Sequence, residues 1–154
     1  IKYEAEMNYA VIPSCTRKIM ATRSGDCGIQ ALMFISLCRS LGIPARWQSG
    51  WVTTPNYWNM HDWAEIYMPP FGWLPVDPSI GYLDSKDSKV KNFLFAGLDV
   101  YRMIANLDCA VAFTPKEKYF RSDPVDNQVG EVQWKDGNLY NNEWEYSVEV
   151  QRIR

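Results

Sequence analysis

Residues 24–46 read SGDCGIQALMFISLCRSLGIPAR, and this stretch has the pattern of one buried helix. Asp26 is a suitable N-cap, Gly42 fits the position just past the last turn, and Pro44 prevents the helix from continuing. The stretch therefore predicts a helix that begins at Cys27. Apolar side chains recur at the spacing of one helix face, at Cys27, Ala31, Phe34, Cys38 and Leu41.

The segments after this helix alternate as strands do. Residues 45–52 (ARWQSGWV) predict a strand with Gly50 as a bulge, and residues 53–59 (TTPNYWN) predict a loop. Residues 60–68 (MHDWAEIYM) alternate, PPFG turns the chain, and residues 73–79 return as a partner strand. A helix ahead of several strands predicts an α+β domain, with the helix packed on an antiparallel sheet.

The flanking regions are less regular. Residues 11–23 carry Pro13 and predict a loop with at most a short helical turn. Residues 92–106 fit either a helix or an extended segment. Asp136 and Gly137 lie between alternating aromatic segments, which predicts a C-terminal hairpin. With no internal repeat and no composition shift, residues 1–154 are interpreted as a single domain.

Composition excludes several classes of function. The 154 residues include 16 basic and 18 acidic side chains, a formal net charge of −2, and no basic run that would suit a nucleic-acid partner. No apolar run is long enough to span a bilayer. The chain starts with Ile1 rather than methionine, which suggests a processed product or a fragment. An extracytoplasmic location is favoured if a signal peptide has been removed.

The cysteines and the single histidine argue against a metal or other cofactor. The four cysteines are dispersed, with no CxxC pair, and a zinc site needs closely spaced ligands. Cys38 follows Cys27 by about three helical turns, a rise of roughly 16 Å. That separation is too long for a disulfide, so we expect Cys38 to be a buried free thiol.

Two interpretations of Cys27 remain open from its position alone. Free cysteine is among the most buried residue types, so Cys27 fits an ordinary core thiol. The first turn of a helix, however, presents unpaired N–H groups and the positive end of the helix dipole, which favour thiolate. Gly25 and Gly28 flank Cys27 and leave room for a substrate backbone. These features fit a nucleophile.

His61 and Asp77 lie on strands that are predicted to pair. Side chains alternate along a strand, so the two share a face only in an even register. In an even register, Asp77 lies directly opposite His61, or it lies opposite Trp63 and is a diagonal neighbour of His61 on the same face. Asp62 is adjacent to His61 in the strand and must point the other way, so Asp77 is the better candidate to orient the imidazole. Pro78 holds Asp77 in an extended conformation.

A thiol, a base and a carboxylate together can form a thioester from an amide. The stretches that hold them, SGDCGIQALMFISLCRSLGIPARWQSGW and HDWAEIYMPPFGWLPVDPS, resemble the core of the transglutaminase-like superfamily. The resemblance covers roughly residues 1–81. It implies a papain-like fold, with Cys27 as nucleophile, His61 as general base and Asp77 as orienting acid.

The resemblance also marks what differs. It implies that helical structure normally precedes IKYE and that residues 82–154 form a C-terminal extension like those of bacterial members, with the aromatic β-hairpin near its end. In relatives, a group upstream of the cysteine completes the oxyanion hole. Tyr3 and Tyr9 are weak candidates for that group here, and the backbone N–H of Cys27 is the better one.

The resemblance implies acyl chemistry on a protein or peptide substrate. We expect peptide or amide hydrolysis, as in a cysteine peptidase, ahead of transamidation that crosslinks proteins. A scaffold or carbohydrate-binding module that retains the three residues is the non-enzymatic alternative. Core packing explains most of the tryptophans, and an ion pair is the simpler role for Glu65. The residues proposed for a substrate groove are Trp58, in the loop before His61, with Trp63 and Glu65.

Overall fold

The computed structural model describes residues 1–3, 14–55, 57–80, 86–121, 123, 125, 128–140 and 142–151. Four strands form one antiparallel sheet in the order β3-β2-β1-β4, and β5 and β6 form a separate hairpin. The elements are α1 (Cys15–Thr22), α2 (Cys27–Ser40), β1 (Ala45–Thr54), β2 (Tyr57–Met68), β3 (Gly72–Val76), α3 (Ser88–Ala96), β4 (Arg102–Asn106), β5 (Val132–Trp134) and β6 (Gly137–Leu139).

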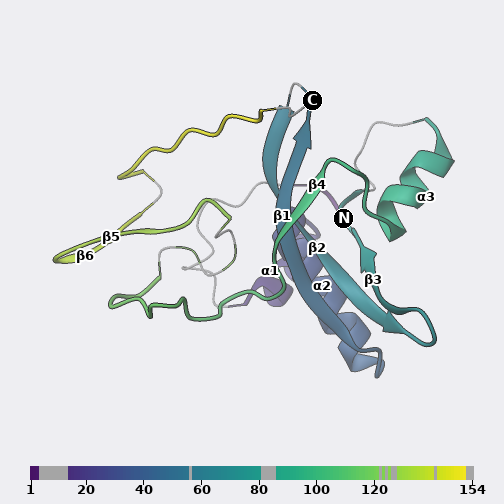
Figure 1. The fold of residues 1–154 in the computed structure, drawn as a ribbon. Coiled ribbons are helices and arrows are strands. Elements are labelled where there is room, and N and C mark those ends of the chain that lie inside the picture. Colours follow the sequence, from purple (N-terminus) through teal and green to yellow (C-terminus); the bar gives the residue numbers. More distant parts are fainter. Residues whose placement is uncertain are drawn as a thin grey trace.

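The α+β class is confirmed. Figure 1 shows α1 and α2 on one side of the four-stranded sheet, and α3 beside β3. None of the helices in the described part of the chain is long and apolar enough to cross a membrane.

The ends of α2 lie where the sequence predicts them. The Asp26 side chain accepts the N–H of Ile29 at 3.0 Å, which satisfies one of the free donors of the first turn. After the last turn, Gly42 takes a φ of 77°, a conformation that glycine adopts without steric cost. The helix therefore begins with Cys27 in its first turn.

The core fills the space between α2 and the sheet. On the strands, Trp47 and Ala64 are paired and face the helix, so the residues next to them, Gln48 and Trp63, point to the opposite face. This alternation decides which side of the sheet each site residue occupies. The buried apolar cluster comprises Ile19, Ile29, Ala31, Ile35, Cys38, Ala45, Trp47, Ala64 and Val125.

The even register of the central hairpin is confirmed. Ala64 pairs with Val76, so in the same register Asp77 lies opposite Trp63 and is a diagonal neighbour of His61. β3 ends at Val76, earlier than predicted, because the N–H of Asp77 donates to the carbonyl of Phe95 at 2.8 Å instead of continuing the ladder. Asp77 is therefore the first residue beyond the strand, held between the sheet and α3.

Two local predictions were wrong. Residues 11–23 contain the helix α1, whose N-cap Ser14 accepts the N–H of Arg17 at 3.3 Å and whose Ile19 packs in the core. Burial of that one side chain, together with the cap, outweighs a weak helical pattern. Residues 53–59 are mostly strand, because β1 and β2 extend to a tight connection after Thr54.

The ambiguous and C-terminal regions follow the sequence in part. Residues 92–106 are both helical and extended, since they hold the end of α3 and the whole of β4. The predicted hairpin forms as β5 and β6, but Gly137 pairs with Trp134, so the turn lies at Lys135 and Asp136.

The predicted irregularity at Gly50 is confirmed. The pairing of β1 with β4 shifts register between Ser49 and Gly50. A Cβ atom at Gly50 would lie 1.9 Å from the carbonyl oxygen of Met103, so only glycine allows β4 to approach this closely. The close approach matters because β4 also carries Arg102.

We expect Gly50→Ala to lower the free energy of unfolding by about 1–3 kcal/mol, because the new methyl group overlaps backbone that must then move. Urea denaturation followed by tryptophan fluorescence measures this loss. Gly137→Ala is the matched control, since its Cβ would meet only Trp134 Nε1, at 3.8 Å. Equal stability of the two variants would contradict the close approach of β4.

Candidate active site

A cleft of about 510 Å³ lies where the start of α2 meets β2. Cys27 and His61 both line it, and Tyr3 contributes from the N-terminal segment. That segment is held against the helix start, because the N–H of Gly25 donates to the carbonyl of Lys2 at 3.1 Å. The described residues that line the cleft are Tyr3, Cys27, Val52, Thr54, Tyr57, Asn59, Met60, His61, Ile80, Leu94, Asp99 and Arg102.

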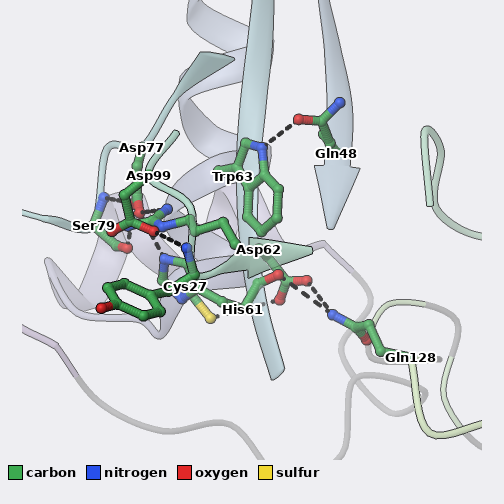
Figure 2. A network of polar contacts seen from close by, with 11 residues as sticks. Cys27, Gln48, His61, Asp62, Trp63, Asp77, Ser79, Asp99 and Gln128 are labelled. Atoms are coloured by element: carbon green, nitrogen blue, oxygen red, sulfur yellow. Dashed lines mark hydrogen bonds and ion pairs between the residues drawn. The ribbon is translucent and has the colours of Figure 1, made fainter. Parts of the chain in front are cut away.

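The imidazole of His61 contacts the carboxylate of Asp77. The distance between His61 Nε2 and Asp77 Oδ2 is 2.6 Å, and both side chains are buried (Figure 2). An ionised carboxylate accepts only, so the contact assigns a proton to Nε2, and in the tautomer with a single ring proton Nδ1 is the proton acceptor. The sequence-based pairing of these two residues therefore corresponds to a direct contact.

Asp77 is held by donors from three segments. Beyond β3, its Oδ1 accepts the N–H of Ser79 at 3.0 Å and the hydroxyl of Ser79 at 2.6 Å. From β4, Arg102 Nη1 donates to Oδ2 at 2.7 Å. The carboxylate is thus fixed in position and its charge is compensated, as burial requires.

Sequence reasoning missed Arg102. Its guanidinium lies over the ring of Trp63, 5.6 Å from the centroid, and its side chain is 4% exposed. The only sequence signal is a basic residue at the start of an apolar, β-branched segment, and such residues usually lie in solvent. The pairing of β4 with β1, which brings Arg102 to Asp77, could not be read from that segment.

The pKa of Asp77 reflects competing effects. Burial alone would raise it, but the hydrogen bonds from His61 and Ser79 and the charges of His61 and Arg102 outweigh burial and lower the pKa to about 2. Asp77 is therefore a carboxylate across the whole physiological pH range.

Asp62 points away from His61, as alternation predicts, and contacts Cys27 instead. The thiol of Cys27 donates to Asp62 Oδ2 across 3.6 Å, and the Asp62 residue is fully buried. Gln128, from the chain after β4, donates through Nε2 to Asp62 Oδ1 at 2.9 Å (Figure 2). No sequence pattern predicts a contact between a carboxylate and this thiol.

The three proposed groove residues are not among the described residues that line the cleft. Trp58 belongs to β2 rather than to a loop, and it stacks on Trp51 with ring centroids 5.4 Å apart. Trp63 has no exposed surface, and its indole N–H donates to Gln48 Oε1 at 2.6 Å. A fully buried ring cannot line a groove.

Glu65 takes the simpler of its two predicted roles. Its Oε2 accepts from Arg46 Nε at 2.6 Å, and the Arg46 guanidinium stacks 4.1 Å from the ring centroid of Trp73. The oxyanion candidate Tyr9 lies outside the described residues, whereas Tyr3 lines the cleft.

Cys38 and Cys109 have different surroundings from Cys27, whereas Cys15 also begins a helix, α1. Cys38 is a buried free thiol, as predicted, and burial raises its pKa. Burial, with the nearby charges of Asp108 and Asp62, raises the pKa of Cys109 to about 11. These environments suppress thiolate, and neither cysteine has the helix-start position of Cys27.

Comparison with known proteins places this geometry in context. A family model described as the transglutaminase-like superfamily matches residues 1–78. The uncharacterized protein YebA of Bacillus subtilis (strain 168) is 31% identical over 94 residues, which covers 46% of this chain and 12% of YebA. A solved structure named a "putative cysteine protease" from Cytophaga hutchinsonii aligns at 27% identity and a TM-score of 0.41, over 51% of this chain and 26% of that one. The chain therefore spans a minor part of the length of both relatives.

The lowered pKa of Asp77 predicts a specific acid sensitivity. A carboxyl group whose pKa is depressed on folding stabilises the fold above its unfolded pKa, near 3.9, and this stabilisation is lost as the pH falls through the folded value of about 2. We expect Asp77 to account for about 2 kcal/mol of the unfolding free energy lost in that window.

Denaturant unfolding at several pH values tests this. Asp77→Asn should be less stable than the wild type at neutral pH, and the difference should shrink as the pH falls from about 4 to about 2. The exposed Asp136→Asn is the control and should parallel the wild type. A constant difference between Asp77→Asn and wild type would contradict the low pKa.

Proposed function

Because the chain belongs to the transglutaminase-like superfamily, we propose that it is a thiol-dependent enzyme, with Cys27 as nucleophile, His61 as general base and Asp77 as the group that orients the base. The observation that carries the proposal is the 2.6 Å contact between His61 Nε2 and Asp77 Oδ2, at the edge of a cleft that Cys27 also lines. The Arg102 guanidinium supports the same arrangement by fixing the carboxylate.

The proposed reaction proceeds in two steps. The Nδ1 atom of His61 takes the Cys27 proton, the thiolate attacks the carbonyl carbon of an amide, and His61 gives its proton to the departing amine. This leaves an acyl group on sulfur as a thioester. A water molecule then gives a proton to His61 and attacks the thioester, which releases a carboxylic acid and restores the thiol. Asp77 remains ionised throughout and stabilises the imidazolium.

The helix start supplies the electrostatic part of the mechanism. The first-turn N–H groups of α2 and its dipole favour the thiolate of Cys27. The backbone N–H of Cys27 is the proposed oxyanion donor, and among the described residues upstream of the cysteine Tyr3 lines the cleft. This arrangement needs no metal ion, so we expect activity to survive a chelator.

We propose peptide or amide hydrolysis as the main reaction, with a protein or peptide as substrate. Transamidation uses the same thioester and differs only in whether an amine replaces water. The non-enzymatic alternative is a scaffold or a carbohydrate-binding module that retains the three residues. The exposed C-terminal aromatic residues include Trp134, Tyr140 and Tyr146, and at least one of them is engaged in packing. Tyr146 packs against Trp58 of β2, with ring centroids 6.2 Å apart. The Tyr146 ring therefore contributes to packing near the turn between β1 and β2.

The proposed activation of Cys27 predicts selective labelling. Iodoacetamide should modify Cys27 near neutral pH well before the buried Cys38, with an apparent pKa below the ~8.5 of a free thiol. His61→Ala should slow the labelling of Cys27. Peptide mass spectrometry of a time course identifies the modified cysteine. If Cys27 labels like an ordinary thiol and His61→Ala has no effect, it is a core thiol and the proposal is wrong.

The thioester predicts a covalent intermediate and a preference for water. Acid quenching during turnover of an activated amide or ester substrate should reveal an acyl adduct on Cys27, and the released acid should contain ¹⁸O when the reaction runs in labelled water. Cys27→Ala should abolish both signals and keep its folded circular dichroism spectrum. If a primary amine at millimolar concentration captures most of the acyl group, transamidation is the main reaction instead.

A further inference from the structure

The thiol of Cys27 is engaged by a carboxylate outside the proposed triad. We propose that Asp62 is a positioning residue that holds Cys27 as a hydrogen-bonded thiol before substrate binds, and that Gln128 limits how strongly it does so. This inference rests on the proposed function of Cys27 as nucleophile, and it adds two residues that the proposed reaction does not use.

The alternation of β2 places two acid–base groups around one sulfur. His61 and Asp62 are consecutive in the strand, so they leave it on opposite sides. His61 turns to Asp77, while Asp62 lies on the helix side, next to the first residue of α2. Figure 2 shows the Cys27 sulfur between the imidazole of His61 and the carboxylate of Asp62.

The complete burial of Asp62 requires hydrogen-bond donors for its carboxylate. Its relative exposure is 0%, and an ionised carboxylate is almost never fully buried unless it is paired or hydrogen-bonded. Donors that reach its two oxygens include the Cys27 thiol, at 3.6 Å from Oδ2, and the Gln128 amide, at 2.9 Å from Oδ1. The two donors come from segments far apart in the chain, so the tertiary fold assembles this group.

Gln128 contacts both strand residues. Its Nε2 lies 2.9 Å from Asp62 Oδ1 and 3.5 Å from the carbonyl oxygen of His61. Its Oε1 is buried and has no hydrogen-bond partner within the described part of the chain, which is a cost that packed proteins usually avoid. The described contacts of the Gln128 side chain are therefore made by its Nε2 donor. A donor on Oδ1 stabilises the negative charge of Asp62, which makes Oδ2 a weaker acceptor for the thiol.

Asp62 acts against the other influences on Cys27. A negative charge beside sulfur disfavours thiolate, whereas the helix start and His61 favour it. The proton then stays on sulfur at rest. When substrate enters, rotation about the Cα–Cβ bond turns the thiol toward His61, where the S–H bond breaks and an N–H bond forms at Nδ1. Because thiolate is the species that oxidants attack, the resting thiol is also protected from peroxide.

Other charged and titratable groups surround this pair, and the test must separate them. The helix contributes Asp26, β2 contributes His61, and β4 contributes Arg102, which is bound to Asp77. Cys109 lies close enough to Asp62 for the carboxylate to act on its pKa, and Cys15 of α1 acts on Cys109 in the same way. Tyr3 lies in the cleft. Among these groups, Asp62 is the one whose contact with the Cys27 thiol the test addresses, at 3.6 Å between Sγ and Oδ2.

The test is the pH dependence of Cys27 alkylation by iodoacetamide in the full chain. Asp62→Asn should move the midpoint to lower pH and raise the rate at pH 6 by about tenfold, which corresponds to a pKa change of about one unit. Gln128→Leu should move the midpoint in the opposite direction and slow labelling at pH 7 by about threefold. In the Asp62→Asn background, Gln128→Leu should have no effect, because Gln128 acts through Asp62.

The controls separate this inference from the proposed function. Asp108→Asn removes an exposed acidic charge next to Cys109 and should leave the Cys27 midpoint unchanged. Failure of His61→Ala to slow labelling contradicts the proposed function. If His61→Ala slows labelling but Asp62→Asn leaves the midpoint in place, only the role of Asp62 is wrong.

A structural role for Asp62 makes a different prediction. Loss of packing lowers the folded fraction, measured by circular dichroism, without moving the midpoint of the remaining folded protein. If Asp62→Asn does not fold, Gln128→Leu decides, and an unchanged midpoint in that variant overturns the inference. Hydrogen peroxide gives a second readout, in which Asp62→Asn should lose its Cys27 thiol faster than wild type near neutral pH.

Discussion

The carboxylate of Asp77 is 2% exposed and receives hydrogen bonds from His61 of β2, from Ser79 beyond β3 and from Arg102 of β4. An isolated charge at this depth would be too costly to keep, so the donors and the carboxylate require one another. The need to compensate the Asp77 charge fixes the His61 imidazole, and the resulting hydrogen bonds connect β2, the end of β3 and β4. The cleft, the base and the edge of the sheet therefore depend on one buried ion.

The β2 strand distributes the chemistry of the site. Because consecutive side chains leave a strand on opposite sides, His61 joins Asp77 while Asp62 meets the start of α2. A single strand thus supplies the proposed base and a second carboxylate. The fold holds the proposed nucleophile Cys27 between these two residues, at the N-terminus of α2, where the helix dipole favours negative charge.

Residues after β4 contact the candidate site and also pack against β2. Gln128 contacts Asp62 and the backbone of His61, and Tyr146 packs on Trp58 near the start of the same strand. The family match ends at residue 78, yet Arg102 and Gln128 lie beyond it. Part of the environment of the site therefore comes from residues outside the matched core.

Local patterns in the sequence determined the framework. The Asp26 cap and the Gly42 stop predicted the limits of α2, and the alternation of residues 60–68 predicted most of β2. Alternation also showed that pairing His61 with Asp77 requires an even register, which the strands adopt. These features depend on backbone period and on neighbours within a few residues, which a sequence displays directly. The same reasoning failed for α1, whose stability comes from burying Ile19 rather than from its own pattern.

Only the tertiary structure decided which distant groups complete the site. Arg102 reaches Asp77 because β4 pairs with β1 at the Gly50 bulge, and Gln128 reaches Asp62 because a later segment packs against β2. Alternation predicted that Asp62 points away from His61, but not that Cys27 lies on that side. Such contacts join residues far apart in the chain, and their partners are set by how the elements pack, which no local period records.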